Sequence, residues 1–200
     1  MRRAACAGKV VAMRFMANLR FRLWMFWWRA DKGPLVLGAV AAAVAGGLAL
    51  AFMQVSNYKD EQSAAVRDGQ ERDLACLALN VYHEARGEPL AGQYAVAEVT
   101  LNRRASRIFP RTVCEVVYQK SWDPIRGRYI GAFSWTELEP LPAPRGEAWR
   151  IARQVAEAVY YGRQPSAVRG AIFYHATYIQ PDWARERQRV AQIGRHVFYR

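Results

Sequence analysis

The sequence predicts a mostly helical α+β domain with a small antiparallel sheet, preceded by one N-terminal transmembrane helix. Three observations lead to this prediction. An uncharged run of 21 residues lies near the N-terminus, apolar residues recur at helical spacing through much of residues 73–161, and residues 171–200 are rich in β-branched and aromatic side chains. A chain of 200 residues leaves room for one domain of common size beside a membrane segment.

The positive charge is concentrated in the N-terminal segment. The formal net charge is +12. Residues 1–34 hold eight Lys or Arg and one acid, Asp31, whereas residues 56–200 hold 21 Lys or Arg and 16 acids, so the two segments carry +7 and +5. A dense positive segment before an apolar run is typical of chain that stays in the cytoplasm. We therefore predict a basic cytoplasmic head over residues 1–34.

Residues 35–55 read LVLGAVAAAVAGGLALAFMQV and contain no charged side chain. A helix of this length, at about 1.5 Å per residue, spans a bilayer core of roughly 30 Å. We predict a single-pass anchor in the inner membrane that leaves the rest of the chain on the periplasmic side. Two alternatives stay open: a buried helix of a soluble protein, and a cleaved signal peptide whose small residues Ala49 and Ala51 suit a signal peptidase.

The exported part divides into a linker and a catalytic domain. Residues 56–72 are polar and predict a linker or a weak surface helix, and residues 73–200 form the predicted domain. Its expected elements are a helix over 73–85 with an acidic start at Asp73, a helix over 90–105, a short helix or strand over 112–119, a loop or small hairpin over 121–144, a helix over 147–161, and segments 171–179 and 190–200 paired as an antiparallel sheet.

Cysteine use fits this division of the chain. Cys6 lies in the predicted cytoplasmic head, whereas Cys76 and Cys114 lie in the exported part, where a disulfide can persist. The alternative is two separate buried thiols, which proteins accommodate well.

The densest group of chemically unusual residues is YHEARGEP, residues 82–89. Glu84 lies there at the end of a predicted helix, beside Gly and Pro. Partial burial would raise the pKa of such a carboxyl group toward the range of a proton donor. An ordinary surface acid gives the same pattern, so the residue type alone leaves both interpretations open.

Other classes of site have less support. The H-E-x-x-H zinc motif fails because Gly87 follows Glu84 at the third position. A site built from His83, His175 and His196 is chemically adequate for zinc, but each histidine lies beside aromatic residues, so we predict no metal and no cofactor. No nucleic-acid-binding motif accompanies the basic charge, and we predict no nucleic acid partner.

Five blocks, in order, resemble the SleB cell wall hydrolase family. They are LALNVYHEARGEPLAGQYAVAEVTLNR from Leu77, FPRTVCEVVYQK from Phe109, AFSW from Ala132, AIFYHA from Ala171 and IGRHVFYR from Ile193. The resemblance implies a lysozyme-like fold that cuts the glycan of peptidoglycan as a lytic transglycosylase or muramidase. It assigns the general acid to Glu84. It places six candidate substrate-binding residues near the cleft: Phe133, Ser134, Trp135, Tyr174, His175 and His196. Core packing is the alternative for the aromatic residues of the AFSW block. Glu88 is a further candidate substrate-binding residue, and its neighbours Gly87 and Pro89 equally suit a role in stabilising a turn.

In a transglycosylase, one carboxyl group suffices, because Glu84 protonates the glycosidic oxygen and then accepts the proton of the attacking muramic 6-hydroxyl. A hydrolysing glycosidase needs a second carboxylate, for which Glu88 is the nearest candidate in sequence. Two alternatives remain: a metal-dependent N-acetylmuramoyl-L-alanine amidase, and a non-catalytic peptidoglycan-binding scaffold. Peptidoglycan and the membrane are the predicted partners in all three cases, and the sequence leaves protein partners open.

Overall fold

The computed structural model describes residues 21–22, 24–25, 28, 31–124, 126–138 and 140–200. The chain divides into two compact units, Met1–Glu61 and Gln62–Arg200. Most of the predicted basic head, including Cys6, lies outside the described residues.

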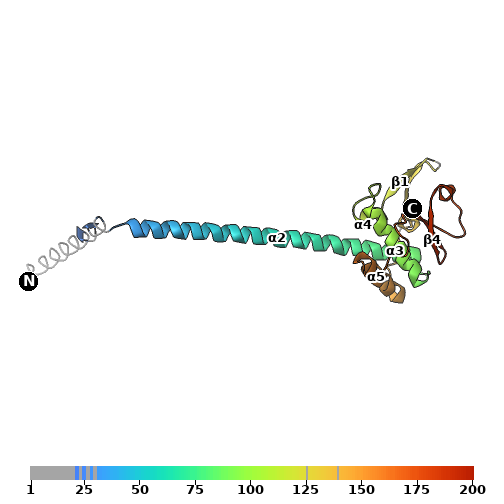
Figure 1. The fold of residues 1–200 in the computed structure, drawn as a ribbon, viewed down its shortest axis with the longest axis horizontal. Coiled ribbons are helices and arrows are strands. Elements are labelled where there is room, and N and C mark those ends of the chain that lie inside the picture. Colours follow the sequence, from blue (N-terminus) through green and yellow to red (C-terminus); the bar gives the residue numbers. More distant parts are fainter. Residues whose placement is uncertain (1–20, 23, 26–27, 29–30, 125, 139) are drawn as a thin grey trace, which may run out of the picture. The chain divides into compact units, whose positions relative to one another are not determined.

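Helix α2 covers Gly33–Ala85 and therefore contributes residues to both units (Figure 1). Within the described part of the chain it is the one helix long and apolar enough to cross a membrane, and residues 35–55 are exposed along their whole length. Residues 56–72 are helical and almost entirely exposed. Of the two interpretations of this segment, a linker or a surface helix, the structure has the helix.

Asp73 does not begin a helix, which corrects the expectation from its acidic character. It lies inside α2, and its Oδ1 accepts the backbone N–H groups of Val113 and Cys114 at 2.9 and 3.4 Å. These N–H groups open helix α4, Val113–Val117, where no earlier turn of helix can accept them. Asp73 therefore caps another helix across the fold. A reciprocal capping box between Thr112 and Glu115 reinforces the same end.

A disulfide joins the same two helices. Cys76 of α2 and Cys114 of α4 are bonded, with their Cα atoms 5.2 Å apart. The structure thus contains the bridge rather than two separate thiols, and it fixes α4 against α2 beside the Asp73 cap.

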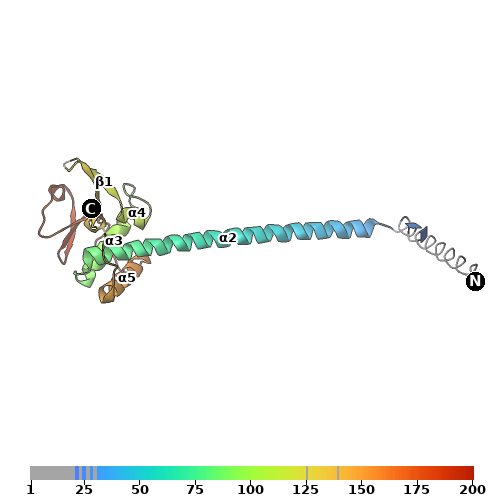
Figure 2. The same cartoon turned by 180° about the vertical axis from the view of Figure 1, so that it is seen from behind.

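Helix α3, Leu90–Ala105, lies between two hydrophobic cores. Ala97 faces the first core, which α2, α4 and helix α5, Gly146–Tyr160, complete. Val96 and Val99 face the second core, together with Phe198 of the sheet. Figures 1 and 2 show α3 among the other helices from both sides. Because both faces are covered, α3 is the element around which the unit Gln62–Arg200 is packed.

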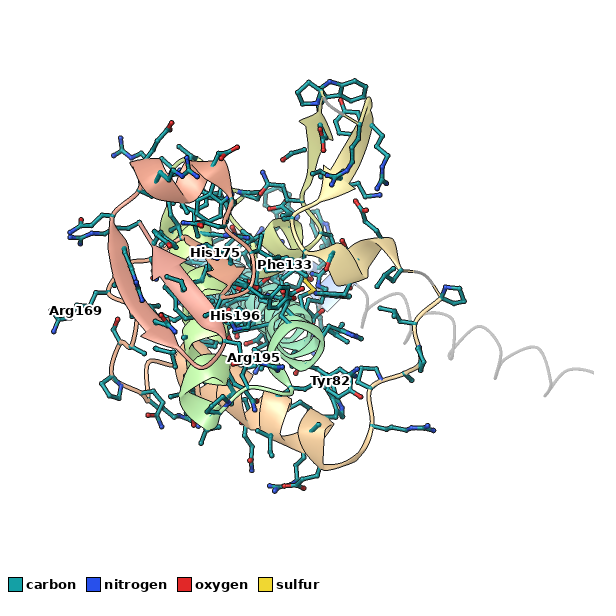
Figure 3. All side chains as sticks on the ribbon, turned by 90° about the vertical axis from the view of Figure 1, so that its right-hand side faces the viewer. Tyr82, Phe133, Arg169, His175, Arg195 and His196 are labelled. Carbon is teal, nitrogen blue, oxygen red and sulfur yellow. A yellow bond between two sulfur atoms is a disulfide. The ribbon has the colours of Figure 1, made fainter. Side chains whose placement is uncertain are left out.

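The described residues form two small antiparallel sheets, and the smaller one is the hairpin that was one of the two alternatives for residues 121–144. Strands β1, Lys120–Asp123, and β2, Arg128–Gly131, form a hairpin, followed by the 3-10 helix η1, Ser134–Glu137. Strands β3, Phe173–Ala176, β4, Arg189–Ile193, and β5, His196–Tyr199, form a sheet in the order β3-β5-β4. A second 3-10 helix, η2, Asp182–Glu186, connects β3 to β4. The hairpin and the larger sheet lie on different sides of the helices (Figure 3).

The pairing of residues 171–179 with residues 190–200 is confirmed, but residues 190–200 are not one strand. They fold back on themselves as the β4–β5 hairpin, and the turn contains Gly194 at φ +57°. This left-handed conformation suits glycine because it has no Cβ. The sequence prediction treated residues 190–200 as one segment, although Gly194 and Arg195 interrupt its apolar residues at the turn.

The disulfide yields a stability prediction. Replacing Cys76 and Cys114 together by alanine should lower the free energy of unfolding by roughly 3–4 kcal/mol, because the bond closes a loop with a sequence separation of 38. Urea unfolding of the oxidised full-length chain in detergent measures the difference. The Cys6→Ser variant is the control and should unfold as the unmodified chain does. Equal stability of the double variant and the unmodified chain would contradict the prediction.

Candidate active site

Glu84 lies in the last turn of α2, at the point where the chain turns into α3. The carbonyl of Ala85 accepts the N–H of Glu88 at 2.9 Å, and Pro89 precedes the first residue of α3. Proline is tolerated at a helix start because its missing N–H would have no partner there. The carboxyl group therefore stands at a helix C-terminus, whose partial negative charge disfavours a carboxylate.

The surroundings of Glu84 hold its pKa above the ordinary value. Burial is the largest cause, since it penalises the charged form. A hydrogen bond from the Tyr174 hydroxyl to Oε2, at 3.0 Å, and the charge of Arg103 act in the opposite direction and offset part of the effect. The result is a half-buried carboxyl group that holds its proton to higher pH than a surface acid while its carboxylate still has stabilising partners.

Tyr174 is held in place as a hydrogen-bond donor. Burial raises its pKa well above the ordinary value, and the charge of Glu84 adds to this, so the hydroxyl keeps its proton. Its position follows from β3, which pairs with β5 so that Tyr174 stands opposite Phe198. The ring also packs against both hydrophobic cores.

Arg103 of α3 supplies a buried positive charge near Glu84 and Tyr174. The residue is 9% exposed, and its guanidinium lies over the rings of Phe109 and Phe133, 5.3 and 5.1 Å from their centroids. Its Nε donates to the carbonyl of Ile172 at 2.8 Å. Burial lowers the pKa of Arg103, whereas the charges of Tyr174 and Glu84 raise it in part. The cation thus both ties α3 to the start of β3 and favours the ionised form of Glu84.

Glu88, the second acid of the same segment, is in a different environment. It is buried, and its two carboxylate oxygens accept the backbone N–H of Arg195 at 2.8 Å and the side-chain Nε at 2.7 Å. Burial alone raises the pKa of Glu88, but the hydrogen bonds from Arg195 and the nearby charges outweigh it and lower the pKa overall. A Cβ on Gly194 would overlap this carboxylate. Glu88 therefore fixes the β4–β5 turn against the α2–α3 turn.

His196 contacts both Tyr174 and Glu88. Its ring meets that of Tyr174 edge-on at 5.2 Å between centroids, and its Nδ1 lies 3.9 Å from Glu88 Oε2. Nδ1 has no hydrogen-bond partner among the described residues. Burial lowers the pKa of His196, and the charge of Glu88 opposes this in part. Figure 3 shows Arg195 and His196 on the sheet side of the helices.

The predicted residues Phe133, Ser134 and Trp135 occupy three different environments. Phe133 is buried under Arg103, and Ser134 is exposed at the start of η1. The Trp135 ring stacks on His83 with 4.5 Å between centroids, and its Nε1 donates to Asn80 Oδ1 at 3.0 Å. Phe133 therefore contacts Arg103, and Trp135 contacts His83, the residue before Glu84. Ser134 is exposed.

Next to this group lies an open cavity of about 330 Å³. Its lining is mostly apolar, with a proline-rich wall: Leu79, His83, Tyr118, Trp135, Pro140, Leu141, Pro142, Ala143 and Pro144. Aromatic and proline surfaces of this kind suit the apolar face of a sugar ring. The cavity borders α2 at the residue directly before Glu84.

The structure does not bring His175 to Glu84. Side chains alternate across a strand, so His175 stands on the face of β3 opposite to Tyr174. There its Nε2 is 3.0 Å from the Tyr199 hydroxyl, and Trp183 packs edge-on against its ring. Within the described residues, no three His, Cys, Asp or Glu side chains are grouped closely enough to hold a metal ion.

Sequence reasoning missed Arg103 and Asn80 as parts of the site. Asn80 is fully buried and donates to Thr100 Oγ1 at 3.1 Å while it accepts from Trp135. The available signal was its spacing: Asn80 precedes Glu84 by four residues, and it lies on the same helical stripe as Leu77 and Val81, where an isolated polar side chain needs a partner.

Comparison with known proteins gives consistent matches to one family. Residues 87–199 match the family model described as Cell Wall Hydrolase, a match that begins after Glu84. Two curated relatives, each named spore cortex-lytic enzyme, come from Oceanobacillus iheyensis, 34% identical over 134 residues, and Bacillus subtilis, 33% identical over 126 residues. These alignments cover 64% and 63% of this chain but 41% and 37% of the relatives, so the chain spans about two fifths of their length.

A solved structure extends the match to three dimensions. The catalytic domain of the Bacillus cereus SleB protein superimposes with a TM-score of 0.50 at 28% identity, covering 65% of this chain and 91% of that domain. The unit Gln62–Arg200 thus has the mostly helical fold of the SleB catalytic domain, with its small antiparallel sheets.

The Glu84–Tyr174 contact yields a prediction about proton affinity. In Tyr174→Phe the pKa of Glu84 should rise further, because the lost hydrogen bond favoured the carboxylate. NMR titration of glutamate carboxyl carbons in the full-length chain measures this value. Tyr178→Phe, at a tyrosine that is 83% exposed, is the matched control and should leave the Glu84 titration unchanged. A lower pKa in Tyr174→Phe would contradict the described geometry.

Proposed function

Because this chain belongs to the cell wall hydrolase family, we propose that it cleaves the glycan strands of peptidoglycan, with Glu84 as the general acid. One observation carries the assignment of the residue: Glu84 is half-buried at a helix end, has a raised pKa and receives a hydrogen bond from Tyr174. A carboxyl group with these properties is suited to act as a proton donor.

The proposed reaction is that of a lytic transglycosylase. Glu84 protonates the glycosidic oxygen, the bond to the anomeric carbon breaks, and the muramic 6-hydroxyl attacks that carbon and returns its proton to Glu84. Tyr174 binds Oε2, which leaves Oε1 to carry the transferable proton. Between the two transfers Glu84 is an anion, and the Tyr174 hydroxyl and the Arg103 charge stabilise it.

The environment of Glu88 supports a one-carboxylate mechanism. A hydrolysing glycosidase needs a second carboxyl group directed at the substrate, as nucleophile or base. Both oxygens of Glu88 are engaged by Arg195, and its lowered pKa reflects these bonds. We therefore assign Glu88 to the support of the site and propose that Trp135 and the adjacent cavity contact the glycan.

We further propose that the catalytic unit, residues 73–200, is tethered to the inner membrane on the periplasmic side. Residues 35–55 would be the anchor and residues 1–34 the cytoplasmic head. Residues 35–55 carry no charge and are exposed along their whole length, which supports their contact with lipid. The length and apolar composition of α2 are also sufficient to cross a membrane. Residues 56–72 would hold the catalytic unit away from the bilayer.

The catalytic proposal is tested by removing the proton of Glu84. Glu84→Gln keeps the shape of the side chain, so cleavage of purified sacculi by the full-length chain should fall by roughly 10²- to 10⁴-fold while the fold persists. Release of muropeptides, followed by mass spectrometry, measures both rate and product. Anhydromuropeptides are the expected product.

Two comparison variants sharpen this test. Glu157→Gln changes an exposed acid of α5 and should retain full activity. Glu88→Gln should cost much less than Glu84→Gln once its folded fraction is accounted for, whereas equal losses would indicate a two-carboxylate hydrolase. Substantial activity in Glu84→Gln, or release of free stem peptides that chelation stops and zinc restores, would refute the mechanism and favour an amidase.

Membrane topology is tested separately. A reporter that is active only in the periplasm should function when fused after Arg200 and stay silent when fused before Leu35, because the positive head is retained in the cytoplasm. The protein should also require detergent for extraction and resist carbonate. The opposite reporter pattern would refute the proposed orientation.

A further inference from the structure

A second cavity lies on the sheet face opposite to Glu84. Its volume is about 560 Å³, within the range of sites that bind small ligands. It is lined by β3, β4, β5 and the η2 segment through His175, Thr177, Ile179, Gln180, Ala184, Arg185, Arg189, Gln192, Val197 and Tyr199. Figure 3 shows His175 on the sheet. This histidine matched the family blocks but has no place in the reaction proposed for Glu84.

The floor of the cavity is a fixed aromatic pair. The rings of His175 and Tyr199 stack with 5.3 Å between centroids, and Trp183 packs edge-on against both. His175 Nδ1 is 2.9 Å from the carbonyl of Ala176, which can only accept, so in the neutral ring Nδ1 donates and Nε2 accepts from the Tyr199 hydroxyl. The Tyr199 oxygen keeps acceptor capacity toward the cavity.

The charged groups that line the cavity are positive. Arg185 and Arg189 contribute two guanidinium groups, and none of the described residues that line it is acidic. The Nη2 of Arg189 donates to Gln192 Oε1 at 2.6 Å, which orients both side chains. Guanidinium groups bind carboxylates through paired hydrogen bonds.

The remaining polar lining suits peptide bonds. Gln180 presents an amide donor and acceptor, Gln192 presents its amide donor beside the oxygen that Arg189 binds, and Thr177 adds a hydroxyl. A ligand that combines an anionic carboxylate with amide groups could therefore hydrogen-bond to the arginines, the glutamines and Thr177. A simple inorganic anion would bind only the arginines.

We propose that this cavity binds a peptide bearing a free carboxylate, of the kind that peptidoglycan carries as stem peptides. The proposal rests on the proposed function for the identity of the peptide. Because Tyr174 and His175 are neighbours on β3, a stem peptide held at His175 would be anchored on the other face of the strand that carries Tyr174, the residue that binds Glu84. The cavity would thus select glycan that carries peptides.

Calorimetric titration of the full-length chain in detergent tests the proposal directly. The probe is a free stem peptide with ionised carboxylates, which contains no glycosidic bond. It should bind, and amidation of its carboxylates should weaken binding about tenfold or more. The double variant Arg185→Gln with Arg189→Gln should weaken binding of the unmodified peptide to the same extent, whereas the Lys equivalents should restore part of it. Arg163→Gln, an exposed arginine after α5, is the matched control and should change nothing.

Each contrary outcome has a defined meaning. Inorganic phosphate or glycerol phosphate that binds as tightly as the peptide would overturn the proposal in favour of a general anion site. Absence of peptide binding, or binding that neither amidation nor the double variant weakens, would overturn it as well. A chain that cleaves sacculi without binding the peptide refutes this inference alone, and a chain that binds the peptide without cleaving sacculi refutes the proposed function alone.

Discussion

Burial of α3 on two faces is the constraint on which the rest of the unit Gln62–Arg200 depends. Ala97 packs into one core and Val96 into the other, so polar residues of this helix such as Thr100 and Arg103 are buried and need partners within the fold. Thr100 bonds Asn80 of α2, and Asn102 and Arg103 bond the carbonyls that precede β3. These bonds determine where α2 ends and where β3 begins, relative to each other.

The candidate acid lies where those two ends meet. Glu84 comes from α2 and Tyr174 from β3. The hydrogen bonds of α3 to both elements hold these two residues at hydrogen-bonding distance. The pKa of Glu84 is the balance of burial, which raises it, against the Tyr174 hydrogen bond and the Arg103 charge, which lower it. A group balanced in this way can both release and regain a proton, as a single acid and base must.

Two glutamates four residues apart show how environment separates their roles. Glu84 lies in the last turn of α2 and Glu88 in the connection to α3, yet the pKa of the first is raised and that of the second is lowered. Glu88 accepts one hydrogen bond from the backbone N–H of Arg195 and one from its charged side chain. Both bonds favour the carboxylate form of Glu88. It thereby holds the β4–β5 turn in place, and through His196 and Tyr174 that turn borders the acid.

Helical spacing, charge bias and short motifs are local properties, so they were enough to predict the helices around Glu84, to propose that Cys76 and Cys114 are exported, and to recognise the resemblance that singled out Glu84. The other features depend on how the chain packs. Asp73 caps another helix, α4. Arg103 lies near Glu84, although the sequence did not predict it as a site residue. His175 was turned away from Glu84, because neighbouring side chains on a strand face opposite sides of its sheet. Contacts between residues distant in the chain depend on packing in three dimensions, which no local pattern specifies.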